Sequence, residues 1–147
     1  MAEFVTFLLA PIGYAGLAVA AVTAARGHVP RALWRAVAVV ILSHVALVWA
    51  VRYGWRLSEA TRDGYAGFVL FHGALLAIVA SAFLRDGLAR PLIIGAFAIV
   101  TVGALGAVFL EEVVAVYRIP VVLCAILGGG GLIRAYLVQH RRGSVRS

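Results

Sequence analysis

Residues 65–84 read YAGFVLFHGALLAIVASAFL, and this stretch decides the class of fold. It contains no aspartate, glutamate, lysine or arginine, and its one histidine is His72. A helix rises about 1.5 Å per residue, so about 20 mostly apolar residues cross the hydrocarbon core of a bilayer. We therefore expect residues 65–84 to form a transmembrane helix.

Four further segments have the same apolar character: 4–25, 33–53, 92–110 and 119–138. The last is interrupted by four consecutive glycines at 128–131, which lower helix propensity or mark a close contact. The sequence thus predicts an all-α bundle of five transmembrane helices. The alternative is four spans, with 119–138 re-entrant or lying on the membrane surface. In both cases residues 1–138 form a single membrane domain, followed by a short basic tail, 139–147.

Composition supports a lipid environment. The chain is 64% hydrophobic and only 13% charged, whereas about 25% of residues are charged in soluble domains. All 13 basic residues are arginines, and they stand at segment ends instead of forming a helical stripe. We therefore expect the lipid bilayer, other membrane subunits or a second copy as partners, and no nucleic acid. The single cysteine, Cys124, lies in an apolar run and predicts a small apolar side chain.

The arginines also predict an orientation. Loops on the cytoplasmic side of a membrane protein carry an excess of basic residues. With five spans, one side holds nine of the 13 arginines, and the other holds four arginines beside the acidic residues. The richer side comprises Arg26, Arg31, Arg35, Arg85, Arg90, Arg134, Arg141, Arg142 and Arg146. The N-terminus is then outside and the tail cytoplasmic, and we expect the plasma membrane.

Two histidines lie within predicted spans, His44 in 33–53 and His72 in 65–84. Ionisable groups at membrane depth are costly and are functional candidates. Counted from the cytoplasmic ends of their helices, His44 lies at about 16 Å and His72 at about 18 Å, at the standard helical rise. Because these helices are antiparallel neighbours, the two imidazoles are expected near one level.

Two imidazoles at one level suit haem b held by an axial ligand from each helix. Arg52 and Arg35, at the ends of the second span, are then candidates for the haem propionates. A proton relay through the histidines is a second interpretation. The third is that each histidine only makes a hydrogen bond within the bundle.

Charged residues gather at the outer end of the fourth span, where Glu111 and Glu112 precede Arg118. This cluster predicts either an ion-paired helix end or a carboxylate at a cation or proton entrance. The chain has no nucleophile elbow, P-loop or zinc-protease motif, so the sequence gives no support for an enzyme of these kinds. Three functions remain as hypotheses: a haem redox protein or respiratory accessory subunit, a small transporter or channel component for protons or a lipid-like substrate, and a non-catalytic assembly subunit.

Overall fold

The computed structural model describes residues 2–62, 64–110 and 112–144, and in these ranges every regular element is a helix. The elements in chain order are α1 (Ala2–Ala25), α2 (Arg31–Val51), α3 (Leu57–Ala60), α4 (Tyr65–Phe83), α5 (Asp86–Leu110), the 3-10 helix η1 (Glu112–Tyr117) and α6 (Arg118–Ser144).

Five of these helices, α1, α2, α4, α5 and α6, are long and apolar enough to cross a membrane. The chain is therefore a multi-pass membrane protein, and the prediction of five spans is confirmed. The re-entrant alternative does not hold, since α6 is one continuous helix that passes through the four glycines at 128–131.

Two helices extend six residues beyond their predicted bounds. The α5 helix begins at Asp86, six residues before the predicted start at 92, because the Arg85 carbonyl accepts the first-turn N–H groups of Leu88 and Ala89. Pro91 thus lies inside the helix. The α6 helix continues beyond 138 to Ser144, and the amide of Gln139 donates to the carbonyl of Ala25 at 2.6 Å.

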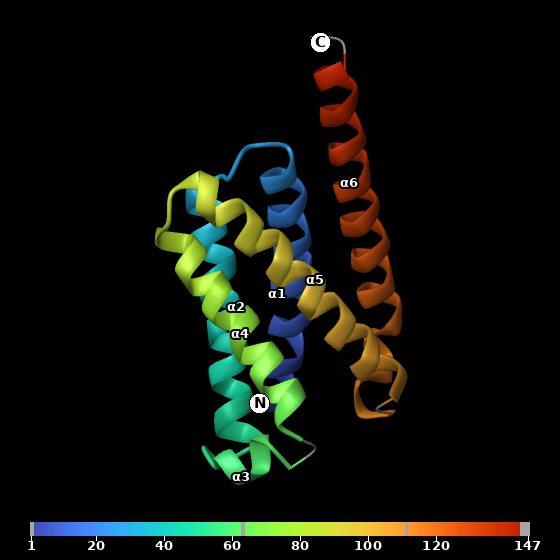
Figure 1. Cartoon of the computed structure of the whole chain (residues 1–147). Helices are drawn as coiled ribbons and strands as arrows, with labels where there is room; N and C mark the ends of the chain where they lie inside the picture. Colours follow the sequence, from blue (N-terminus) through green and yellow to red (C-terminus); the bar gives the residue numbers. More distant parts are fainter. Residues whose placement is uncertain (1, 63, 111, 145–147) are drawn as a thin grey trace.

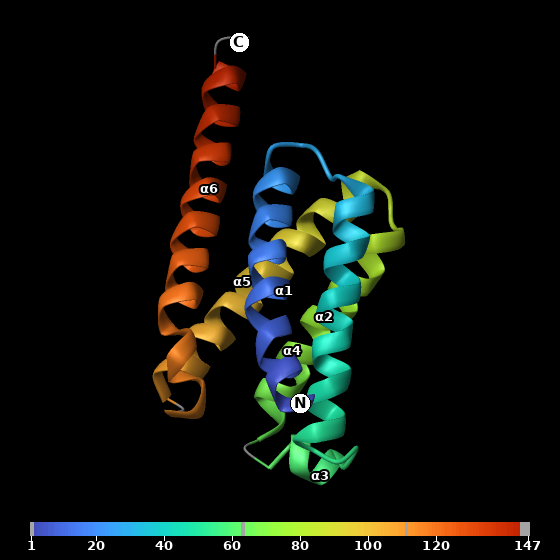
Figure 2. The same ribbon diagram turned by 180° about the vertical axis from the view of Figure 1, so that it is seen from behind.

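Helix α1 packs against α2, and α4 packs against α5. Helix α6 lies against α1 and α5 (Figure 1). The α5 helix runs obliquely across the bundle from the end of α4 to the start of α6, as both views show (Figure 2). The start of α1 and the end of α6 lie at opposite ends of the bundle (Figure 1). We call the end that holds the α1–α2 and α4–α5 turns the basic end, and the opposite end, near α3, the α3 end.

Arginines at the basic end satisfy carbonyls at helix C-termini. Arg31 and Arg35 of α2 donate to Ser81 and Ala82 near the end of α4, and Arg90 of α5 donates to Ala24 near the end of α1. The last carbonyls of a helix have no donor within the helix and carry partial negative charge. The residues that predict the orientation therefore also join neighbouring helices.

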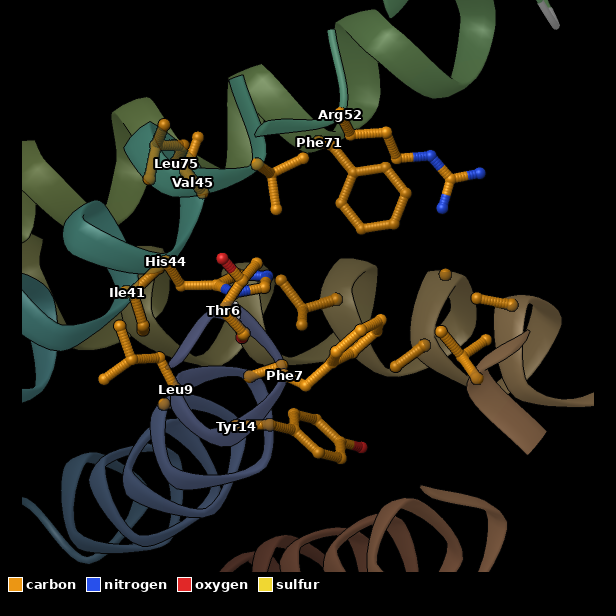
Figure 3. Close-up of a pocket in the computed structure, with 18 of the residues that line it drawn as sticks. Thr6, Phe7, Leu9, Tyr14, Ile41, His44, Val45, Arg52, Phe71 and Leu75 are labelled. Atoms are coloured by element: carbon orange, nitrogen blue, oxygen red, sulfur yellow. Dashed lines mark hydrogen bonds between the residues drawn. The ribbon is translucent and has the colours of Figure 1, made fainter. Parts of the chain in front are cut away.

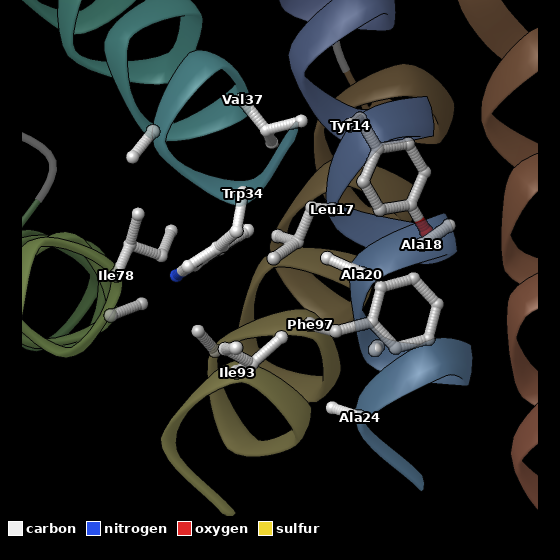
Figure 4. Packing of buried hydrophobic residues seen from close by; sticks show 14 of the residues in the cluster. Tyr14, Leu17, Ala18, Ala20, Ala24, Trp34, Val37, Ile78, Ile93 and Phe97 are labelled. Atoms are coloured by element: carbon white, nitrogen blue, oxygen red, sulfur yellow. The ribbon is translucent and has the colours of Figure 1, made fainter. Parts of the chain in front are cut away.

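Trp34 links α2 to α4 at the basic end through a hydrogen bond. Its side chain is 0% exposed, and its indole N–H donates to the Ser81 hydroxyl at 3.1 Å. The Ser81 hydroxyl donates in turn to the Ile78 carbonyl at 2.7 Å. Figure 4 shows the indole directed toward α4, between the apolar side chains of α1 and α5. A tryptophan near the start of a span is typical of the membrane interface, but the Trp34 side chain is buried, and Ser81 supplies its acceptor inside the bundle.

The glycine run of α6 allows close contact with α1 and α5. A Cβ at Gly131 would lie 2.6 Å from a methyl group of Val22, and one at Gly128 would lie 2.4 Å from the Phe97 ring. A Cβ at Gly129 or Gly130 would meet nothing within 4 Å. The contacting glycines are three residues apart, so they occupy one helix face, as packing through small residues requires.

Gly131→Ala should therefore destabilise the protein, because Val22 is β-branched and has little rotamer freedom in a helix. We expect a loss of about 1–3 kcal/mol, the usual range for overpacking. Gly130→Ala is the matched control: it lies in the same helix and should be neutral or stabilising by up to about 1 kcal/mol. Thermal unfolding in detergent measures both. Equal melting temperatures for the two variants would contradict the packing of α6 on α1.

Candidate functional site

A cavity of about 770 Å³ lies between the helices, on the α3 side of Trp34. Its walls come mainly from α1, α2, α4 and α5, and they are mostly apolar. The polar side chains that line it are Thr6, Tyr14, His44, Arg52, Tyr53, Glu59, Arg62, His72 and Tyr117. A volume of 300–1,000 Å³ is typical of small-molecule sites. The cavity therefore has the volume of a small-molecule site.

Charged residues line the cavity near α3. Arg52 is the residue directly after α2, Glu59 lies in α3, and Arg62 lies just beyond α3. The Glu59 carboxylate and the Arg62 guanidinium are 3.9 Å apart. The chain turns back here through Gly54 and Trp55, whose φ angles are +53° and +59°. This turn, which the sequence did not reveal, brings the polar loop beneath the apolar helices.

His44 projects from α2 into the cavity, close to α1 (Figure 3). Its Nδ1 lies 3.0 Å from the backbone carbonyl of Thr6. A carbonyl only accepts, so Nδ1 carries the proton and donates it. In the neutral ring Nε2 is then an acceptor, and none of the described residues hydrogen-bonds to it.

His72 projects from α4 and lines the same cavity, but both of its ring nitrogens are engaged. The Trp49 indole N–H donates to Nε2 at 3.2 Å, and Nδ1 lies 2.8 Å from the Phe68 carbonyl. An indole N–H only donates and a carbonyl only accepts, so the tautomer is fixed with the proton on Nδ1. The Phe68 ring stacks on the imidazole, with 4.0 Å between centroids. His72 thus connects α4 to α2.

The predicted propionate residues do not lie together. Arg52 lines the cavity near α3, whereas Arg35 is at the basic end, where its Nε is 3.4 Å from the Ala82 carbonyl. They stand near opposite ends of α2. A single haem edge would not meet both guanidinium groups.

The predicted outer charge cluster is described only in part. Glu111 lies outside the described residues, and Glu112 is exposed at the start of η1. Arg118 donates to the Val108 carbonyl at 2.8 Å and lies over the Phe109 ring at 5.7 Å. Between Arg118 and Glu112, both in the described part of the chain, there is no ion pair. Arg118 therefore caps α5, as Arg90 caps α1.

Sequence reasoning missed the aromatic side chains of the cavity. Phe7 and Tyr14 come from α1, Phe71 from α4, and Tyr117 from the end of η1. The Tyr14 hydroxyl donates to the Thr101 hydroxyl at 2.8 Å, across α1 and α5. Aromatic residues are common in apolar helices, so nothing in their spacing marks them; only the rotation of each helix places them in the cavity.

Comparison with protein-family models, curated proteins and solved structures gives no match to this chain. What the fold defines is a class, the small all-helical multi-pass membrane protein with five spans. Its function is inferred from the cavity.

Proposed function

We propose that this protein binds a lipid-like amphipathic molecule in the cavity between α1, α2, α4 and α5. Such binding corresponds to one of the hypotheses drawn from the sequence, a small transporter of a lipid-like substrate. The observation that carries it is the distribution of polarity: apolar walls inside the bundle and charged residues near α3. An apolar tail lies against the walls, and polar atoms reach Arg52, Glu59 or Arg62.

The wall contacts favour a lipid-like ligand over an ion. Walls built from residues such as Leu17, Val48 and Leu75 offer no ligand to a bare cation, which needs several oxygen or nitrogen donors. Apolar surface instead contributes about 25 cal/mol for each Å² removed from water. A molecule that arrives from the bilayer is already out of water. The shape of the cavity and its few polar contacts then decide which lipid-like molecule it retains.

The charge distribution supports an orientation in which the basic end faces the cytoplasm and the α3 end faces outside. The ligand then exchanges with the outer leaflet or the outer aqueous phase of the plasma membrane. A fluorescent protein fused to the C-terminus should therefore fold and fluoresce in the cytoplasm. Fluorescence lost at that position and gained at an N-terminal fusion would reverse the orientation.

Ala107→Phe tests the occupancy of the cavity. Ala107 lines the cavity on α5, so a phenyl group there takes the space of the ligand. We expect native mass spectrometry of the wild type, purified in mild detergent, to show a bound amphipath, and the variant to lose most of it. Ala98→Phe, on an exposed position of the same helix, should retain the molecule. Wild-type protein without an adduct would contradict the proposal, as would equal adducts in both variants.

A second candidate is haem b binding, because His44 and His72 both line the one cavity. An axial ligand needs a free nitrogen lone pair, and only His44 offers one in this arrangement. Ligation by His72 through Nε2 requires the Trp49 hydrogen bond to break. This obstacle makes haem the weaker candidate.

Haem binding predicts a Soret band that shifts on reduction, in protein expressed with haem available. His44→Ala and His72→Ala should each abolish it. A featureless visible spectrum would overturn haem binding and leave the lipid-like ligand untouched. The assembly hypothesis stays a prediction, tested by the dependence of the protein's stability on another subunit.

A further inference from the structure

The two cavity histidines differ in whether their Nε2 atom already accepts a hydrogen bond from the protein. Both Nδ1 atoms donate to backbone carbonyls, of Thr6 for His44 and of Phe68 for His72. The Nε2 of His72 already accepts from Trp49, but the Nε2 of His44 has no such partner among the described residues. The cavity therefore contains a fixed hydrogen-bond acceptor without a protein donor.

A tautomer fixed in this way discriminates between ligands. Turning the ring over, or moving its proton, would break the bond to the Thr6 carbonyl and leave that carbonyl without its side-chain donor. A neutral His44 thus accepts from a ligand hydroxyl or N–H and cannot donate to a ligand carbonyl or ether. The Tyr14 hydroxyl donates its proton to Thr101, so this proton is not offered to a ligand carbonyl either.

The shape of the cavity near His44 favours a flat ring. Figure 3 shows Phe71 on one side of the space and Phe7 and Tyr14 on the other, with the imidazole at its edge. A Cβ at Gly103 would lie 2.0 Å from the tip of the Phe71 ring, so α5 has no side chain where that ring rests. Aromatic rings prefer offset or edge-to-face contact with other rings. An aromatic ligand gains such contacts between these walls.

We propose that the cavity binds a hydroxylated aromatic ring that carries an apolar tail, a phenol or a hydroquinone lipid, whose hydroxyl donates to Nε2 of His44. This inference rests on the proposed function and names the chemistry of its ligand. The selectivity is for the donating form: a phenol over its methyl ether, and a hydroquinone over the corresponding quinone.

The test is a competition in lipid nanodiscs between 4-dodecylphenol and its methyl ether, which share ring and tail and differ only in the donating hydroxyl. Both probes are added at equal mole fraction, and native mass spectrometry compares their adducts on the full chain. We expect the phenol adduct to exceed the ether adduct by about tenfold, the value of one hydrogen bond of about 1.4 kcal/mol.

Variants test the role of His44. His44→Phe should bring the ratio close to one, because it removes the acceptor and keeps a ring. His44→Gln should restore the preference, since its amide N–H₂ can donate to Thr6 while its oxygen accepts from the phenol. His28→Phe is the matched control and should keep the preference, because His28 is exposed in the α1–α2 turn and does not line the cavity.

Equal wild-type adducts would overturn this inference and leave the proposed function standing. The same holds for a phenol preference that persists in His44→Phe or disappears in His28→Phe. Absence of both adducts from the wild type would overturn the inference. If the wild type also carried no co-purified amphipath, the proposed function would fail with it.

Discussion

Carbonyl groups in the last turn of a helix have no donor within that helix, and in this bundle side chains of neighbouring helices supply the donors. Arg31 and Arg35 reach the end of α4, Arg90 reaches the end of α1, and Arg118 reaches the end of α5. Each arginine therefore joins the end of one helix to the first turns of another.

The position of the cavity depends on where side chains link the helices to one another. At the basic end α2 and α4 are joined by two arginines and by the buried Trp34–Ser81 pair, and the Arg31–Asp86 ion pair joins α2 to the start of α5. Toward α3 the described link between the same helices is Trp49 to His72. These links lie mostly at the basic end, α5 crosses the bundle obliquely (Figure 1), and the cavity lies toward the other end.

The two histidines are at a similar depth but have different hydrogen-bond partners. Residue type and helix position place both near the same level, and both do line one cavity. Their partners depend on helix rotation: His72 meets the indole of Trp49, while His44 meets only a backbone carbonyl and keeps an open acceptor. One imidazole joins helices, and the other faces the cavity with a free acceptor nitrogen.

Much of the fold could be predicted from the sequence because hydrophobic length is a local property. The predicted spans 4–25 and 65–84 agree with α1 and α4 to within a few residues. The glycines at 128–131 were correctly considered a site of close contact, but their partners Val22 and Phe97 could not be named. The burial of Trp34 and the early start of α5 were also missed, since the first depends on the Ser81 hydroxyl across the bundle and the second on the Arg85 carbonyl.

A ligand in the proposed site lies in the α3 half of the bundle and away from the basic end, and tryptophan fluorescence distinguishes these two positions. One variant retains only Trp49 (Trp34→Phe, Trp55→Phe), and the other retains only Trp34 (Trp49→Phe, Trp55→Phe). A 4-dodecylphenol brominated on its ring quenches nearby indoles. We expect saturable quenching of Trp49, relieved by excess unbrominated 4-dodecylphenol, and no saturable quenching of Trp34. Saturable quenching of Trp34, or quenching of Trp49 that the competitor does not relieve, would contradict this position of the ligand.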